Sequence, residues 1–460
     1  MNLQAPIAEV VENKRNFFLT GQTKNIQFRL EKLRKLKTGF NLHERAIIQA
    51  LKADLGRPEV EAFTSEIFLI NQEIEHAIKH LKTWSKPKNT NVPWQLLPAT
   101  ASIYPEPLGV ILIIGAWNYP FQLNILPLIG AIAAGNCVII KPSEYAPQTS
   151  CLIAEIVGKI FDEDYISVIE GDVTISQQLL AQRFDHIFFT GSATVGKIIM
   201  AAAAQNLTPV TLELGGKSPC IVDIHTDIQK TARRITWGKF SNAGQACIAP
   251  DYLLVHKDIK FQLLESVKKY IQEFYGENPA NSPDYGRIIN LKQFDRLVEL
   301  LSYGEIAIGG ETNREQLYIA PTIVDRVSWQ NEIMLSEIFG PILPVLAYED
   351  ITEAITKINS QPKPLALYLF SQNEHLQKKI IQETSSGGVC FNDTLLQYCV
   401  PTLPFGGIGN SGIGNYHGKA SFDTFSHYKS VLHKPFFLAS KLLYPPYKGK
   451  LSLLKKILNF

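Results

Sequence analysis

Three polar residues of the chain have the types and surroundings needed for nucleophilic chemistry at a carbonyl group. Cys247 lies in the Gly- and Asn-bearing loop SNAGQACIAPDY, and a thiol at such a turn is accessible to a substrate. Glu213 follows an apolar strand in LELGGK, where apolar neighbours raise the pKa of a carboxyl group toward that of a general base. Asn118 in AWNYPF is an uncharged hydrogen-bond donor that suits an oxyanion. Together the three types indicate a thiol nucleophile, a base and an oxyanion donor.

Each of these residues also has an ordinary structural explanation. A lone cysteine is usually a small buried apolar side chain. Glu213 is equally consistent with an ion pair formed with Lys217, and Asn118 with a turn before Tyr-Pro. Considered singly, the three residues leave both explanations open.

The other cysteines indicate neither a disulfide framework nor a metal site. The chain has six cysteines and no CxxC pair, at positions 137, 151, 220, 247, 390 and 399. Scattered free thiols are typical of a reducing compartment. Since the N-terminal sequence also lacks the apolar segment of a signal peptide, we expect a cytoplasmic protein with no bound metal.

Length and composition limit the class of protein. The 460 residues exceed one ordinary core and predict two or three packed lobes. With 45% hydrophobic and 19% charged residues and a net charge of +2, the sequence is typical of a globular protein and indicates no nucleic-acid partner. The uncharged stretch from Pro107 to Ile140 is interrupted by Asn, Gln and Pro, so it predicts a strand, a helix and a second strand rather than a membrane span.

The candidate residues follow a run of short apolar strands separated by helical segments. The predicted strands cover residues 109–117, 136–143, 165–172, 186–192 and 209–216. This alternation predicts an α/β fold with an open parallel sheet, which binds ligands beyond the C-terminal ends of its strands. Four of these ends carry distinctive residues, namely Asn118, Lys141 to Glu144, Gly191 to Gly196, and Glu213 to Gly216.

A second α/β series extends from Ser218 to Asn392 and predicts a second lobe. Its predicted strands cover residues 218–224, 251–256, 365–371 and 387–393. From Asp393 the chain is richer in Gly, Pro and aromatic residues and fits the pattern of neither lobe.

The ordered motifs of the chain resemble those of the aldehyde dehydrogenase superfamily, and most closely its class 3, or fatty aldehyde, branch. The resemblance extends from about Leu33 to about Leu432. The motifs are PLGVILIIGAWNYPFQL, KPSE, FTGSATVGK, LELGGKSP, GQACIAPDY, EIFGPILPV and LPFGGIGNSGIGNYHGKASFDTFSHYKS. The last of these, and IAPDY after Cys247, point to class 3.

The resemblance implies a domain organisation. We expect two α/β lobes, an NAD-binding variant Rossmann domain over residues 1–85 and 107–213 and a catalytic thiol domain over residues 214–392. A small β extension over residues 86–106 and 393–430 is expected to bridge two subunits of a homodimer. Residues 431–460 form a C-terminal tail.

The resemblance also implies roles at matching positions. Cys247 corresponds to the nucleophile, Glu213 to the base for the hydrolytic water, and Asn118 with the backbone N–H of Cys247 to the oxyanion hole. NAD is the expected cofactor, with NADP as an alternative. The residues expected to contact it are Trp117, Lys141, Ser143, Glu144, Gly191, Ser192, Val195, Gly196, Leu214, Gly215, Glu337 and Phe339.

The expected function is the oxidation of an aldehyde to its carboxylic acid through a thiohemiacetal and a thioester on Cys247. The substrate is expected to be a medium- or long-chain aliphatic, aromatic or isoprenoid aldehyde. Two alternatives are a dehydrogenase that transfers the thioester to coenzyme A and a non-catalytic binding protein of the same fold. The basic, Leu-bearing tail either lies in a membrane interface or packs over the protein.

Overall fold

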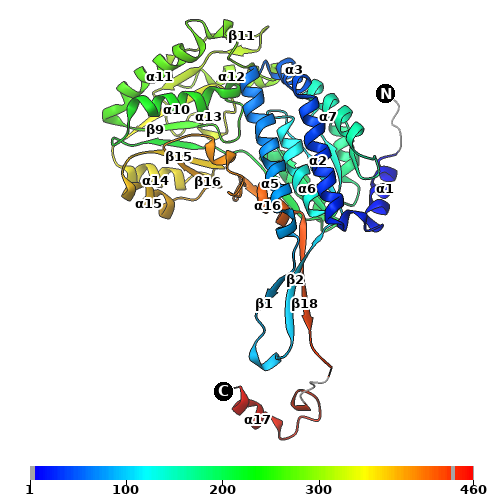
Figure 1. Cartoon of the computed structure of the whole chain (residues 1–460). Helices are drawn as coiled ribbons and strands as arrows, with labels where there is room; N and C mark the ends of the chain where they lie inside the picture. Colours follow the sequence, from blue (N-terminus) through cyan, green and yellow to red (C-terminus); the bar gives the residue numbers. More distant parts are fainter. Residues whose placement is uncertain (1–5, 437–440, 459–460) are drawn as a thin grey trace. The chain divides into compact units, whose positions relative to one another are not determined.

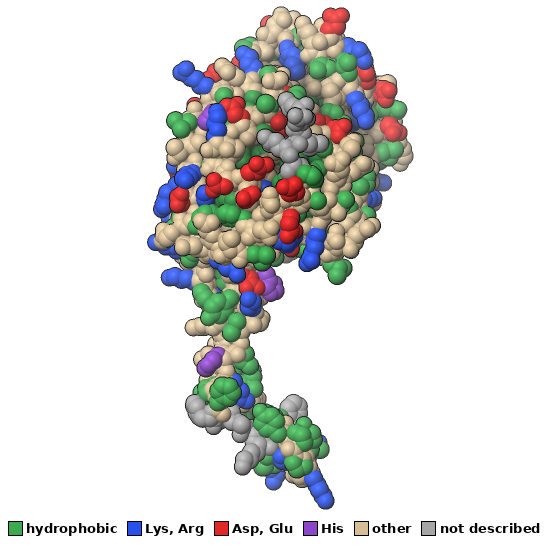
Figure 2. All heavy atoms as spheres, turned by 90° about the vertical axis from the view of Figure 1, so that its right-hand side faces the viewer, with side chains coloured by type: hydrophobic (Ala, Val, Ile, Leu, Met, Phe, Trp, Pro, Cys, Tyr) green, Lys and Arg blue, Asp and Glu red, His purple; other side chains and the backbone are tan. Residues whose placement is uncertain are grey.

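The computed structural model describes residues 6–436 and 441–458, which form two compact units (Figure 1). The main unit contains the chain up to Trp84 and Pro107–Ser426, and the arm unit contains Ser85–Glu106 and the chain from His427 onward. Figure 2 shows acidic and basic side chains mixed over one face of the main unit.

Amphipathic helices form the N-terminal part of the main unit and cover its six-stranded sheet (Figure 1). Their buried faces carry residues such as Leu33, Ile47 and Ile74, which belong to the same core as the strands. Asn25 caps the second helix because its side-chain oxygen accepts hydrogen bonds from two backbone N–H groups of the first turn. The helices are α1 (Ile7–Leu19), α2 (Ile26–Leu42), α3 (Glu44–Leu55), α4 (Glu59–Ala62) and α5 (Leu69–Trp84).

A six-stranded sheet forms the centre of the first lobe, in the order β17-β7-β6-β3-β4-β5. All neighbours are parallel except β17, which is antiparallel to β7. The strands are β3 (Val110–Ile114), β4 (Cys137–Lys141), β5 (Ile166–Val168), β6 (His186–Thr190), β7 (Val210–Glu213) and β17 (Gly412–Ile413). The five parallel strands confirm the sequence prediction. The crossover helices are α6 (Gln122–Ala134), α7 (Pro147–Ile160), α8 (Val173–Leu180) and α9 (Ala193–Ala204).

The uncharged stretch from Pro107 to Ile140 contains β3, α6 and β4, as predicted. Every residue of α6 is buried, which explains why the sequence carries no charge there. Within the residues that the structure describes, no helix combines the length and the apolar character needed to cross a bilayer.

A seven-stranded sheet forms the second lobe, in the order β10-β13-β14-β9-β8-β15-β16. Its strands are β8 (Pro219–Val222), β9 (Tyr252–His256), β10 (Glu305–Ile308), β13 (Thr322–Asp325), β14 (Ile342–Tyr348), β15 (Ala366–Phe370) and β16 (Gly388–Phe391). Its helices are α10 (Ile228–Phe240), α11 (Lys260–Tyr275), α12 (Leu291–Leu300), α13 (Glu332–Leu335), α14 (Ile351–Asn359) and α15 (Glu374–Glu383). A separate hairpin joins β11 (Thr312–Asn313) and β12 (Tyr318–Ile319). The predicted class, two α/β lobes, is confirmed.

The segment 393–430 does not lie wholly in the extension that the sequence predicts. Residues up to Ser426 belong to the main unit, where β17 joins the first sheet and α16 (Gly418–Thr424) packs on α5 and α6. Gly412 permits this close pairing, because a Cβ there would lie 2.3 Å from the carbonyl oxygen of Leu212. The Gly- and Pro-rich composition of the segment is not typical of a strand, so β17 was not predicted.

The arm unit contains a three-stranded sheet in the order β1-β2-β18. The strands are β1 (Lys88–Thr90), β2 (Thr100–Pro107) and β18 (Ser426–His433). Lys429 on β18 donates to the carboxylate of Glu106 on β2. A short helix, α17 (Lys450–Ile457), follows in the same unit.

Candidate active site

Cys247 lies in a loop between α10 and β9 whose backbone is strained. The residues just before it form a tight turn, in which Asn242, Ala243 and Gly244 have φ of 51°, 50° and 73°. Gly244 is required there because a Cβ would lie 2.2 Å from the carbonyl oxygen of Gly340. Strain of this kind is kept where the surrounding structure fixes a functional loop.

The thiol of Cys247 lies close to two carboxyl groups. Burial raises its pKa well above the ordinary value, the charges of Glu337 and Glu213 raise the pKa further, and nearby backbone N–H groups, including that of Ile248, lower it. The thiol is therefore protonated at rest and needs a base before it can attack a carbonyl carbon.

Asn118 follows β3 and contacts the Cys247 loop directly. Its Nδ2 donates to the backbone oxygen of Gln245 at 3.1 Å, and its own carbonyl oxygen accepts from Nδ2 of Asn242 at 2.9 Å. The side chain is buried, with 3% of its surface exposed. Because an amide nitrogen carries two hydrogens, one donor remains for a ligand.

Glu213 is the last residue of β7 and pairs in register with Gly412. Among the described residues, neither of its carboxyl oxygens has a hydrogen-bond partner, although the residue is only 3% exposed. Burial alone raises its pKa well above the ordinary value. An unpaired buried carboxyl group is costly, and such groups are typical of functional sites.

Polar groups suited to a dinucleotide gather at the carboxyl edge of the first sheet. Lys141 ends β4, and its Nζ lies 2.7 Å from Oε2 of Glu144, while Ser143 accepts the Tyr145 N–H at 3.3 Å. Ser192 caps the N-terminus of α9, where backbone N–H groups and the helix dipole favour a pyrophosphate.

Three glycines at this edge allow neighbouring side chains to pack closely against the backbone. A Cβ on Gly196 would lie 2.8 Å from Leu214, and one on Gly191 would lie 2.5 Å from the ring of Phe189. A Cβ on Gly215 would lie 1.8 Å from the carboxyl group of Glu337. Val195, in the first turn of α9, is 42% exposed.

Glu337 and Phe339 reach the same region from the second lobe. The rings of Phe339 and Trp117 meet edge to face at 5.2 Å, and Phe339 has a φ of 52°. Burial, followed by the charge of Asp251, raises the pKa of Glu337 to about 8. β3, β4, β6 and β7 all end at this edge, so the predicted residues that follow them lie along it, and Glu337 and Phe339 meet Gly215 and Trp117 there from the second lobe. The donors present at this edge fit NAD or NADP.

Two buried charged residues near this site were not predicted from the sequence. Arg57 is fully buried and donates to the backbone carbonyl of Asn118 and to Glu66. Lys239 on α10 is also fully buried, and burial lowers its pKa to about 8. No periodicity or motif distinguishes such residues from solvated ones, so only the fold reveals them.

The comparisons with known proteins agree with this geometry. The model of the aldehyde dehydrogenase family matches residues 4–431. The chain is 50% identical to 4,4'-diaponeurosporen-aldehyde dehydrogenase of Staphylococcus aureus, with 95% of this chain and 96% of that protein covered. It is 49% identical to aldehyde dehydrogenase family 3 member A2 of Pongo abelii (97% and 94% covered) and 47% identical to the dimeric NADP-preferring aldehyde dehydrogenase of Canis lupus familiaris (97% and 99%).

A solved structure of a related aldehyde dehydrogenase has the same fold. The substrate-bound state of Staphylococcus aureus AldH superposes with a TM-score of 0.96 at 49% identity, with both chains covered completely. The activity shared at this level of similarity is the NAD(P)-dependent oxidation of an aldehyde to its carboxylic acid. The chain therefore belongs to the aldehyde dehydrogenase family, in its class 3 branch.

Proposed function

We propose that Cys247, Glu213 and Asn118 carry out the oxidation of the aldehyde. The observation that supports these roles most strongly is the buried carboxyl group of Glu213, which has no hydrogen-bond partner in the described part of the chain and whose charge acts on the thiol of Cys247. Asn118 joins them because it is anchored to Gln245, two residues before the nucleophile, and keeps one amide hydrogen for a ligand.

The chemistry begins with the attack of the Cys247 thiolate on the aldehyde carbon, which makes that carbon tetrahedral. The second amide hydrogen of Asn118 and the backbone N–H of Cys247 would stabilise the oxyanion, each contributing about 3 kcal/mol. When bound, NAD(P) supplies the hydride acceptor. Loss of hydride leaves a thioester on Cys247, and Glu213 accepts a proton from the water that hydrolyses it.

Hydrolysis distinguishes this proposal from transfer of the acyl group to coenzyme A. Thiol exchange needs a general base less than hydrolysis does, and Glu213 offers such a base beside the nucleophile. Steady-state NAD reduction with a medium-chain aldehyde, with and without coenzyme A, tests the choice. A rate that requires coenzyme A would support acyl transfer, and no rate under either condition would support a binding protein.

We propose that NAD is preferred over NADP because Glu144 lies at the expected adenosine ribose position. A carboxylate there accepts hydrogen bonds from a 2′-hydroxyl and repels a 2′-phosphate, while the nearby Lys141 permits some NADP use. We expect kcat/KM for NAD to exceed that for NADP about tenfold, equivalent to about 1.4 kcal/mol, and Glu144→Ser to reduce this ratio. A higher kcat/KM for NADP that Glu144→Ser leaves unchanged would refute the assignment.

We propose that the arm unit joins two subunits into a homodimer. The unit exposes large apolar side chains, namely Trp94 (58%) and Leu97 (57%) between β1 and β2 and Leu432 (56%) on β18, and β1 and β18 are edge strands. Pairing across a two-fold axis would cover both features, and one relative is itself named dimeric. Light scattering at micromolar protein should give the dimer mass, and a monomer mass would contradict the proposal.

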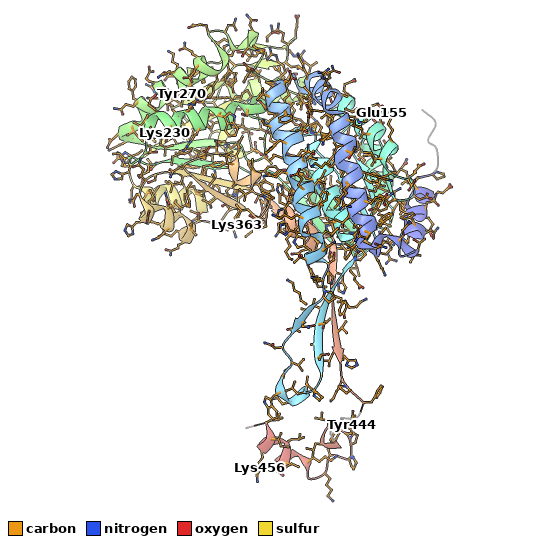
Figure 3. All side chains as sticks on the ribbon, in the orientation of Figure 1. Glu155, Lys230, Tyr270, Lys363, Tyr444 and Lys456 are labelled. Carbon is orange, nitrogen blue, oxygen red and sulfur yellow. The ribbon has the colours of Figure 1, made fainter. Side chains whose placement is uncertain are left out.

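The C-terminal tail is proposed to contact either an anionic membrane or the protein itself. Leu451 in α17 and Leu458 just after it share one helical face and are 67% and 38% exposed, and Lys455 and Lys456 lie in the last turn. Figure 3 labels Tyr444 and Lys456 in the tail, whereas Phe460 lies outside the described residues. A short basic amphipathic helix of this kind can bind at the lipid interface.

Co-sedimentation with anionic liposomes decides between the two locations of the tail. If the tail binds lipid, the full chain should sediment and a truncation before Lys434 should remain in the supernatant. Equal binding by both proteins, or none by either, would leave packing on the protein as the remaining proposal.

The proposed substrate is a poorly soluble aldehyde of the fatty, aromatic or isoprenoid class. Two of the relatives support this proposal, since one is named for an isoprenoid aldehyde and the other belongs to family 3. A panel of aldehydes of graded chain length and aromaticity, assayed with NAD and NADP, would identify the preferred class.

A further inference from the structure

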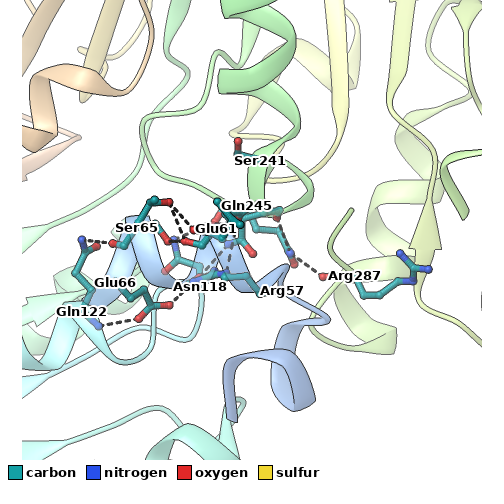
Figure 4. Close-up of polar contacts among 12 residues, drawn as sticks. Arg57, Glu61, Ser65, Glu66, Asn118, Gln122, Ser241, Gln245 and Arg287 are labelled. Carbon is teal, nitrogen blue, oxygen red and sulfur yellow. Dashed lines mark hydrogen bonds and ion pairs between the residues drawn. The ribbon is translucent and has the colours of Figure 1, made fainter. Parts of the chain in front are cut away.

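A buried ionic cluster contacts the loop that carries Asn118 (Figure 4). Its centre is Arg57, which lies between α3 and α4 and has no exposed surface. The guanidinium donates through Nη1 to Oε1 of Glu66 and through Nη2 to the backbone carbonyl oxygen of Asn118. One rigid planar group thus joins a buried carboxylate to the peptide of Asn118.

Glu66 fixes the chain that follows Asn118. Its Oε2 accepts the backbone N–H of Phe121 at 2.9 Å and of Gln122 at 2.8 Å, at the start of α6. Arg57 and Glu66 therefore hold both the carbonyl of Asn118 and the helix that begins just after it.

The same carbonyl of Asn118 is tied to the nucleophile loop. It accepts a second hydrogen bond from Nδ2 of Asn242 at 2.9 Å, and that nitrogen also donates to the backbone oxygen of Gln245 at 3.1 Å. Asn242 belongs to the strained turn that precedes Cys247. Arg57 and Asn242, one from each lobe, thus both donate to the carbonyl of Asn118. Together they fix the orientation of the main chain from which the side-chain amide of Asn118 extends.

The ionic character of the cluster is difficult to explain by stability alone. Arg57 lies between the carboxyl groups of Glu61 and Glu66, and its Nε is 3.7 Å from Oε1 of Glu61. Burial raises the pKa of both glutamates, and the charge of Arg57 lowers it. Removing such charges from water costs free energy that an apolar replacement would avoid. A fixed geometry is what the charged cluster provides and an apolar one would not.

We propose that Arg57 is a positioning residue for the oxyanion hole and acts through the main chain of Asn118. By holding the Asn118 carbonyl with Asn242, it aims the remaining amide hydrogen at the oxyanion before the substrate arrives. Preorganised donors are effective because they need no reorientation during the reaction. The inference rests on the proposed role of Asn118 in catalysis.

Arg57→Lys is the substitution that tests this role. It keeps the positive charge beside Glu61 and Glu66 but lacks the planar fork that reaches two acceptors in fixed directions. Arg57→Lys should therefore retain the fold while it loosens the Asn118 peptide. Arg314→Lys, at an exposed ion pair with Asp295, is a matched control.

The experiment compares Arg57→Lys, Asn118→Ala and the double variant in two assays. One is single-turnover NAD reduction with an aldehyde, and the other is acylation of Cys247 by p-nitrophenyl acetate, which passes through a similar oxyanion and needs no hydride acceptor. We expect Arg57→Lys to slow both reactions about 10- to 100-fold, with the Kd for NAD and the Tm little changed. The double variant should be no slower than Asn118→Ala, because both changes act on one donor.

The results distinguish the positioning role of Arg57 from the catalytic role of Asn118. Full activity in Asn118→Ala would refute the role of Asn118 itself. If Asn118→Ala is slow but Arg57→Lys is as fast as Arg314→Lys, or if the two effects multiply in the double variant, the positioning role of Arg57 is refuted. If Arg57→Lys does not fold, the charge-neutral pair Arg57→Met with Glu66→Gln is judged by the same criteria.

Discussion

Cys247→Ala is expected to abolish NAD(P)-dependent aldehyde oxidation, with a fall in kcat of about 10⁴-fold or more. An aldehyde cannot lose hydride until a nucleophile makes its carbon tetrahedral, and the substitution removes that nucleophile. The methyl group of alanine fits the space of the thiol, so the fold and the cofactor edge should be retained. Steady-state NADH formation and the Kd for NAD, measured on the same sample, check both expectations.

Cys399→Ala is a suitable control for this prediction. Cys399 is also a half-buried free cysteine in the main unit, and it lines a small cavity with Tyr398 and His417. It should retain most of the activity because no catalytic step uses it. Normal turnover in Cys247→Ala, or complete loss in Cys399→Ala, would mean that the nucleophile has been assigned to the wrong thiol.

Glu213→Gln is expected to produce a burst of about one equivalent of NADH followed by turnover at least about 100-fold slower than normal. The amide preserves the shape of the side chain but cannot accept a proton from water. Hydride loss should therefore still occur once, after which the thioester accumulates. Stopped-flow absorbance with excess aldehyde and NAD measures both phases.

The pH dependence of turnover gives an independent test of the same residue. Burial raises the pKa of Glu213 well above its ordinary value, so the proportion of the base form increases as pH rises through that raised pKa. Wild-type deacylation should accelerate over this interval, and Glu213→Gln should lack the acceleration. A Glu213→Gln variant with normal steady-state turnover and an unchanged pH profile would exclude this carboxyl group as the base.

The sequence predicted the parts of the site that end regular strands. Asn118, Lys141, Ser192 and Glu213 follow or end apolar strands with clear turn signals, so parallel pairing necessarily brings them to one edge. Cys247 needed the family resemblance, because a cysteine in a polar loop is not distinctive alone.

Other parts of the fold had no signal of this kind. β14 contains Pro344, which argues against a central strand, and β10 is an exposed edge strand, so neither matched the pattern of a buried strand. Arg57 and Glu66 have the appearance of ordinary polar helix residues, and their burial follows from contacts between segments far apart in the chain. Tertiary context, rather than local pattern, determines such positions.

The most direct test of the covalent mechanism is intact-protein mass spectrometry of Glu213→Gln after reaction with NAD and an aldehyde. The thioester should appear as one adduct per subunit, with the mass of the aldehyde less two hydrogen atoms, and peptide mapping should locate it on Cys247. Hydroxylamine should remove the adduct, as expected of a thioester. If NADH forms without an adduct, or if the adduct lies on a different cysteine such as Cys399, the proposed covalent mechanism on Cys247 is contradicted.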